Sequence, residues 1–168
     1  MSATQQITSK LIQETIVRAV QNVSNTLLHC PAQLIAPLEP DIPAYSAEPY
    51  HVIGNVGFVG DANGIIYLCM TAEFARFAVG QILGLSPAEV DLHGPDVLQD
   101  AIGEMTNITV GGFKNEICDL GYPCRLTLPT IVLGTGLTVA SIKGATRHRF
   151  SFRCREHHFV ADLQLKAD

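Results

Sequence analysis

Apolar residues recur at helical spacing in three stretches of the chain, and each stretch predicts an amphipathic helix. The first stretch covers residues 8–28, and the second covers residues 71–85, with Thr71 as its N-cap. The third begins at Asp96, which we expect to cap it, and continues to about residue 119, where a glycine and a proline end it.

Six further stretches are rich in apolar β-forming residues, which predicts strands. They form three pairs: residues 51–59 and 65–70 around a Gly-Asp-Ala-Asn-Gly turn, residues 126–133 and 137–142 around Gly-Thr-Gly, and residues 147–154 and 158–165. Because the helices cluster between two groups of strands, this order predicts an α+β fold with a layered, mostly antiparallel sheet packed against helices. We expect a single domain over residues 1–168, in which five prolines make residues 31–49 a connecting loop or edge segment.

Charged residues are few, since 16 acidic and 11 basic side chains make up only 16% of the chain, against roughly 25% in an average domain. A surface this poor in charge suggests that a second copy of the chain covers part of it, as in a homodimer. The net charge of −5 argues against nucleic acid as a partner. No apolar run approaches the roughly 20 residues of a membrane span, and the first residues do not look like a signal peptide, so we expect a soluble, cytoplasmic protein.

The five cysteines are an odd number without a Cys-x-x-Cys pair, which disfavours a disulfide framework and favours reduced, mostly buried thiols. A zinc site built from Cys118, Cys124, Cys154 and either His157 or His158 is a weaker alternative, because the spacings lack the short paired ligands of structural zinc. We therefore expect no metal or other cofactor of the protein's own.

Asp100, Glu104 and Asn107 form a polar stripe on the third predicted helix. Positions i, i+4 and i+7 lie within about 60° of one another around an α-helix, so the helix would offer two carboxylates and a carboxamide on one side. The opposite side carries residues suited to a core, namely Leu98, Ala101, Ile102, Met105, Ile108, Gly112 and Phe113. Gly103 and Gly111 flank the stripe although each costs roughly 1 kcal/mol inside a helix, which indicates close approach of another surface.

The stripe alone is a weak indication, because exposed helix faces ordinarily carry acids and amides. With each residue type at a frequency of about 5%, the pattern arises by chance in about 2% of chains of this length. Its context adds weight: a hairpin with the sequence VGFVGDANGIIYLCM and a helix precede the Asp-x-x-x-Glu-x-x-Asn helix, and Pro129 follows it before a further hairpin.

Over roughly residues 8–145 this order resembles the CheX family of chemotaxis phosphatases, relatives of CheC and of the FliM/FliY switch proteins. The family motif is Ser or Asp, three residues, Glu, two residues and Asn, with a proline some twenty-two residues later. In this chain residues 108–128 separate Asn107 from Pro129, which is one residue short of that spacing. The motif occurs once, which points to the CheX branch rather than to CheC.

The resemblance implies a CheX/CheC-like fold and hydrolysis of the phosphoaspartate on the receiver domain of a CheY-like response regulator. It implies a catalytic pair, in which Asn107 positions the attacking water and Glu104 docks onto a lysine of the regulator. A carboxamide both donates and accepts hydrogen bonds, so Asn107 suits this task. Asp100 would orient Glu104, contact the partner or be solvated. The Mg²⁺ that the reaction requires is expected in the regulator, and the family's pairing of subunits through their sheets fits a homodimer.

A second interpretation is a non-catalytic signalling adaptor of the same fold, which binds a response regulator or a flagellar-switch partner. Glu104 and Asn107 turned into the core, or covered by a subunit partner, would favour the adaptor. Lys114 continues the stripe, but we expect it to be solvated rather than to contact phosphate.

The predicted strand at residues 147–155 alternates, which would turn five polar side chains outward: Arg147, Arg149, Ser151, Arg153 and Arg155. Such a charged strand face usually protects a sheet edge from aggregation. An acidic regulator or a dimer contact is an alternative use of these arginines, and nucleic-acid binding is a third, weaker function for the chain.

Overall fold

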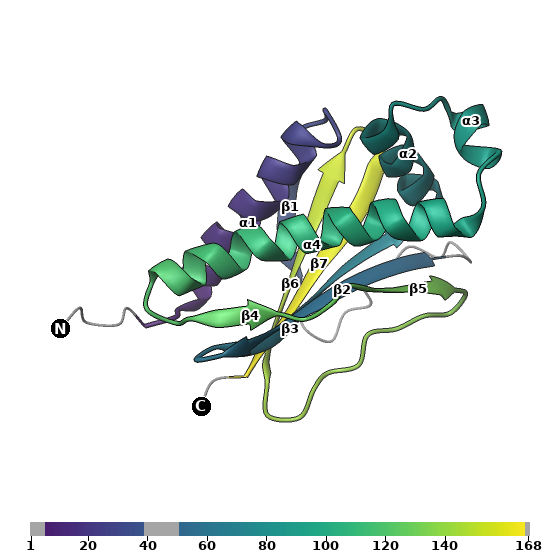
Figure 1. Cartoon of the computed structure of the whole chain (residues 1–168). Coiled ribbons are helices and arrows are strands. Elements are labelled where there is room, and N and C mark those ends of the chain that lie inside the picture. Colours follow the sequence, from purple (N-terminus) through teal and green to yellow (C-terminus); the bar gives the residue numbers. More distant parts are fainter. Residues whose placement is uncertain (1–5, 39–50, 167–168) are drawn as a thin grey trace.

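The computed structural model describes residues 6–38 and 51–166, so residues 39–49 of the predicted connecting segment lie outside the described part. Within that part, seven strands form one sheet and the helices pack against one of its faces (Figure 1). The elements are α1 (Ser9–Thr26), β1 (Gln33–Leu38), β2 (His51–Gly60), β3 (Asn63–Thr71), α2 (Ala72–Leu83), α3 (Pro87–Asp91), α4 (Pro95–Asp119), β4 (Cys124–Leu126), β5 (Thr130–Gly134), β6 (Thr146–Cys154) and β7 (His157–Lys166). This arrangement confirms the predicted α+β fold.

Every strand pairing in the sheet is antiparallel, and the strand order is β1-β6-β7-β3-β2-β4. The strand β5 also pairs with β2, so β4 lies beside residues 58–60 of β2 and β5 lies beside residues 51–55. The strand β6 is interior, between β1 and β7. The expectation that its arginines protect a sheet edge is therefore wrong.

The starts of the helices agree with the sequence at α2 and differ at α4. The Thr71 hydroxyl caps α2 as predicted. At α4 the N-cap is Gly94, which has no side-chain cap bond, and Pro95 takes the first helical position. Asp96 is thus not the cap; it lies in the first turn, where a negative charge is favourable beside the helix N-terminus. Ser86 begins the additional short helix α3 with a capping box.

The chain after α4 departs from the two predicted strands at residues 126–133 and 137–142. Residues 127–129 separate two short strands, β4 and β5, and residues 137–142 form no strand. The latter segment lies over the sheet face opposite the helices, in an apolar cluster made of Ile53, Cys69, Val160, Tyr67, Leu137 and Val139. The Gln164 amide holds it there, donating to the Ala140 carbonyl at 2.9 Å and accepting from the Ile142 N–H at 2.6 Å. A side chain on β7 thus replaces the strand pairing that the local sequence predicts.

The same sheet face buries part of the predicted row of arginines. Arg149 is only 5% exposed. The Arg147 guanidinium donates two bonds to the fully buried Asp162 carboxylate, at 3.1 Å and 2.6 Å. Arg153 and Arg155 are exposed, and the Arg155 guanidinium lies 5.1 Å from the centre of the Phe77 ring. The strand β6 therefore does not offer the expected outward row of arginines to an acidic partner or to nucleic acid.

The main core lies between the sheet and the helices, and α4 contacts β2 closely within it. A methyl group at Gly54 of β2 would overlap the Oγ1 atom of Thr106 in α4. Thr106 is fully buried and donates its hydroxyl to the Ile102 carbonyl at 2.7 Å. Glycine at position 54 thus sets the distance between β2 and the residue that precedes Asn107. None of the helices in the two described ranges is long and apolar enough to cross a membrane.

Candidate functional site

The helix α4 carries the predicted polar stripe on its outer side. Asp100 and Glu104 are exposed, and Asn107 is half-buried. Of the residues expected to face the core, four are buried, namely Ala101, Ile102, Met105 and Phe113, and three are half-buried, namely Leu98, Ile108 and Gly112. The helix is therefore amphipathic in the predicted sense, with the stripe on the accessible side.

Asn107 lies at the seam between α4 and the segment that contains β4 and β5. Gly103, Asn107 and Gly111 follow one another at four-residue spacing, so they form one line along the helix. A methyl group at Gly103 would lie 4.0 Å from Cγ1 of Ile131, and one at Gly111 would lie 3.8 Å from Cδ1 of Leu126. Both distances are ordinary van der Waals contacts, so alanine would fit at either position and the expected close approach of another surface is not found within the described part of the chain. The neighbour on this side is the chain's own edge, which Figure 1 shows running beside α4.

Residues 127–129 connect the strand that faces Gly111 to the strand that faces Gly103. Asn107 is midway between these two glycines along α4, so we infer that this connection passes near it. Pro129 is exposed in this connection. Of this connection, the sequence indicates only Pro129, as the proline of the family motif, and does not single out Leu128.

The polar atoms of the stripe are free to meet another molecule. Among residues 6–38 and 51–166, no side-chain hydrogen bond or ion pair engages Asp100, Glu104 or Asn107. Exposure of both carboxylates leaves them solvated, and the half-buried position of Asn107 restricts the space into which its carboxamide can turn. The stripe can therefore offer an amide and two carboxylates whose polar atoms are not engaged by other described side chains.

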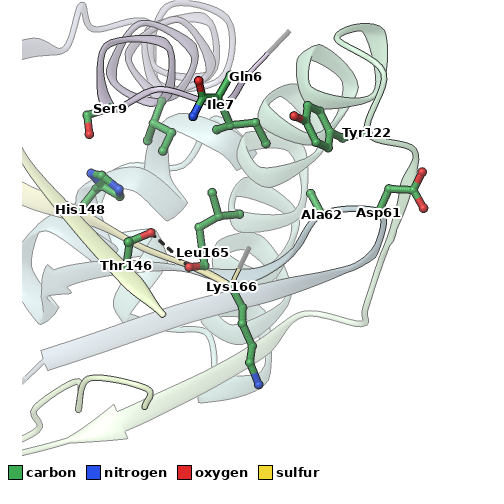
Figure 2. A pocket seen from close by; sticks show the side chains of 11 residues that line it. Gln6, Ile7, Ser9, Asp61, Ala62, Tyr122, Thr146, His148, Leu165 and Lys166 are labelled. Atoms are coloured by element: carbon green, nitrogen blue, oxygen red, sulfur yellow. Dashed lines mark hydrogen bonds between the residues drawn. The ribbon is translucent and has the colours of Figure 1, made fainter. Parts of the chain in front are cut away.

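The stripe does not line the cavity of about 380 Å³ that Figure 2 shows. That cavity lies among the start of α1, the β2–β3 turn, the start of β6 and the end of β7, with Ser9, Asp61, Tyr122 and His148 around it. Burial lowers the pKa of His148 below its usual value. Asp100, Glu104 and Asn107 instead lie on an open surface, which suits contact with a large partner better than enclosure of a small ligand.

Lys114 is half-buried and lies near the beginning of β4. Burial, together with the neighbouring Cys118, raises the pKa of the Cys124 thiol to about 11, and the Lys114 ammonium is close enough to oppose this rise. Lys114 is thus less solvated than expected from the sequence.

The cysteines do not form the zinc site weighed from the sequence. The Sγ atoms of Cys118 and Cys124 lie 3.9 Å apart, whereas Cys154 is joined to Cys30 in a disulfide. The expectation of reduced thiols is therefore wrong for Cys30, in the connection between α1 and β1, and for Cys154 at the end of β6. Within the described ranges, no group of three or more histidine, cysteine, aspartate or glutamate side chains is placed to hold a metal ion.

Several known proteins are similar to this chain. A crystal structure of the chemotaxis protein CheX from Desulfovibrio desulfuricans superposes with a TM-score of 0.76 and 22% identity, over 92% of this chain and 99% of that one. The CheX–CheY–BeF₃–Mg²⁺ complex from Borrelia burgdorferi gives a TM-score of 0.69 and 20% identity, over 92% and 97%.

A curated CTP synthase from Roseiflexus castenholzii is 30% identical over 121 residues, which is 67% of this chain and 21% of the synthase. The chain therefore spans about a fifth of the length of that curated relative. The family described as chemotaxis phosphatase CheX matches residues 52–153, which hold the hairpin β2–β3, the whole of α4 and most of β6. The chain belongs to the CheX family of chemotaxis phosphatases.

Proposed function

We propose that this protein hydrolyses the phosphoaspartate of a CheY-like receiver domain, with Asn107 and Glu104 as the catalytic pair. The family supports the reaction class, and a relative of the same fold has been crystallised with CheY, BeF₃ and Mg²⁺. The observation that carries the proposal is the position of the pair: a carboxylate and a carboxamide lie unengaged on one accessible side of α4.

In the proposed reaction, water attacks phosphorus in line with the aspartyl oxygen of the regulator. The bond between phosphorus and this oxygen breaks, the carboxylate leaves with the electron pair, and inorganic phosphate forms after the water proton is lost to solvent. Asn107 accepts a hydrogen bond from the water through its carbonyl oxygen, which orients an oxygen lone pair toward phosphorus. Because the carboxamide does not titrate, this positioning does not depend on pH.

Glu104 acts by docking in this proposal. Its exposed carboxylate pairs with a lysine of the receiver domain and places the phosphoryl group against Asn107, while Asp100 adds negative charge one turn earlier. Positioning of this kind accounts for about 10²- to 10⁴-fold in rate, or roughly 3–5.5 kcal/mol of activation free energy. The Mg²⁺ that neutralises phosphoryl charge is assigned to the regulator rather than to this chain.

The test is release of inorganic phosphate from a phosphorylated receiver domain, measured with the wild-type protein and with Asn107→Ala. We expect acceleration by the wild type, a loss of about 10²-fold or more in Asn107→Ala, and a large loss in Glu104→Ala. Asn115→Ala is the matched control, because Asn115 is an exposed asparagine on the same helix two turns beyond Asn107. Equal rates for the wild type and Asn107→Ala would reject the catalytic assignment.

The adaptor alternative differs in one measurable respect. An adaptor would bind the phosphorylated receiver domain without speeding loss of its phosphate. The exposure of Glu104 and the partial exposure of Asn107 speak against one of the two arrangements that would favour the adaptor, namely burial of these side chains in the chain's own core.

We also propose that two copies of the chain form the working assembly. Within the described residues, β1 pairs only with β6, so the outer edge of β1 is available for a second sheet. Light scattering on the purified protein would give twice the chain mass of 18.1 kDa if this is correct.

A further inference from the structure

The connection between β4 and β5 carries a leucine that packing within the chain does not explain. Leu128 is 88% exposed, the highest value among the large apolar side chains of the described residues. The neighbouring Pro129 is exposed as well. Two adjacent apolar residues therefore face solvent in a connection of three residues, 127–129.

This connection is held firmly on both sides. The Thr127 N–H donates to the Gly57 carbonyl at 2.8 Å, and the Gly57 N–H donates to the Thr127 hydroxyl at 2.9 Å. After Pro129, the β5 ladder to β2 begins at Thr130. Proline further restricts the backbone between these anchors. Leu128 is thus displayed in a defined place, so its burial by a partner would cost little ordering of the backbone.

The position of Leu128 relates it to the proposed reaction. The connection that holds Leu128 joins the parts of β4 and β5 that face Gly111 and Gly103, and Asn107 lies midway between these glycines on α4. A folded domain that brings a phosphoryl group to Asn107 would therefore cover Leu128 at the same time. A small phosphorylated molecule at Asn107 would not extend that far.

We propose that Leu128 is a docking residue for the receiver domain and contributes to affinity rather than to the chemical step. This inference rests on the proposed function and names a second part of the partner-binding surface, beside the charged stripe. The stripe supplies negative charge from Asp100 and Glu104. Leu128 supplies apolar area, which partner-binding surfaces concentrate at their centre.

The experiment compares steady-state phosphate release by the wild type and by Leu128→Ser at varied concentrations of the phosphorylated receiver domain. Loss of one buried leucine contact is expected to raise KM roughly 10- to 100-fold while kcat stays within twofold. Leu128→Met should restore most of the affinity. The control is Ile142→Ser, which changes a side chain that is 43% exposed in the segment covering the other face of the sheet, and its KM should not change.

Binding of the receiver domain activated with BeF₃⁻ and Mg²⁺ separates the possible failures. An unchanged KM and Kd for Leu128→Ser, with a wild type that releases phosphate, would overturn the docking inference and leave the proposed function intact. A wild type that binds without releasing phosphate, combined with weaker binding by Leu128→Ser, would overturn the hydrolase and support the docking inference. Because Leu128 is exposed, its substitution should leave the melting temperature unchanged, and a lowered one would show a structural role instead.

Discussion

The contact between Gly54 and Thr106 gives a sharp test of how the fold positions Asn107. In Gly54→Ala the added methyl would overlap the Thr106 Oγ1 atom and would also lie 3.2 Å from Cδ1 of Ile131. Thr106 is fully buried, so it has little room to turn away. Either the Thr106 hydroxyl gives up its bond to the Ile102 carbonyl or α4 moves away from β2.

Overpacking of this kind costs about 1–3 kcal/mol in free energy of unfolding. For a chain of 168 residues, each kcal/mol corresponds to roughly 2–4 °C, so we expect the melting temperature of Gly54→Ala to fall by about 2–12 °C. A shift of α4 by a fraction of an ångström displaces the neighbouring Asn107, and misplacement of a catalytic group by about 1 Å can cost 10²-fold in rate. We therefore expect kcat for phosphate release to fall more than KM rises.

Three variants make this test specific. Thr106→Ala combined with Gly54→Ala removes the overlapping atom and should recover much of the lost stability, whereas Thr106→Val keeps an atom at that place and should not. Gly112→Ala is the control, since its new methyl would lie 3.5 Å from the nearest atom, an ordinary contact, and alanine favours the helix. A Gly54→Ala protein that melts with the wild type, or a double variant without recovery, would refute the idea that this contact sets the position of α4.

Two further predictions concern buried and half-buried ionisable groups. Arg147→Ala leaves the Asp162 carboxylate fully buried without this cation, so the free energy of unfolding measured in urea should fall by about 3–5 kcal/mol. A fall of less than about 1 kcal/mol would contradict the importance of this ion pair. Burial lowers the pKa of His148 in the folded protein, so the unfolded chain binds more protons as pH falls below about 6.5. Stability should therefore decrease as pH falls from 7 toward 5, and this decrease should be smaller in His148→Gln, as measured by melting temperature across that range.

The helices could be predicted from the sequence because each buries one side on a continuous core. The apolar spacing placed α1, α2 and α4 to within a few residues. The wrong predictions arose where the partner of a segment lies far away in the sequence. Residues 137–142 have the composition of a strand, but Gln164 and the apolar cluster on β3 and β7 hold them in a non-strand path. The alternation in β6 likewise predicted which residues share a face of the strand. It could not predict that Asp162 on β7 places a buried carboxylate beside Arg147, which donates to it.

The helical part of the candidate site could be predicted from the sequence, whereas only Pro129 of its edge part was named, through the family motif. Spacing within one helix fixes which residues share a side, so the stripe of Asp100, Glu104 and Asn107 follows directly from the sequence. The catalytic roles of these residues stay a prediction. The place of Leu128 and Pro129 beside Asn107 depends on the break of the expected strand at residues 127–129, which no local pattern indicates.

The position of Asn107 depends on a glycine on the inner side of α4. Gly54 admits Thr106 there, because a methyl group at position 54 would overlap the Thr106 Oγ1 atom. On the outer side, methyl groups at Gly103 and Gly111 would make only ordinary contacts with Ile131 and Leu126, at 4.0 and 3.8 Å, so alanine fits at both positions. The distance between α4 and β2 is therefore the one that a glycine sets. These contacts do not involve the Asn107 side chain, so Asn107→Ala should abolish phosphate release while its melting temperature stays within about 2 °C of the wild type.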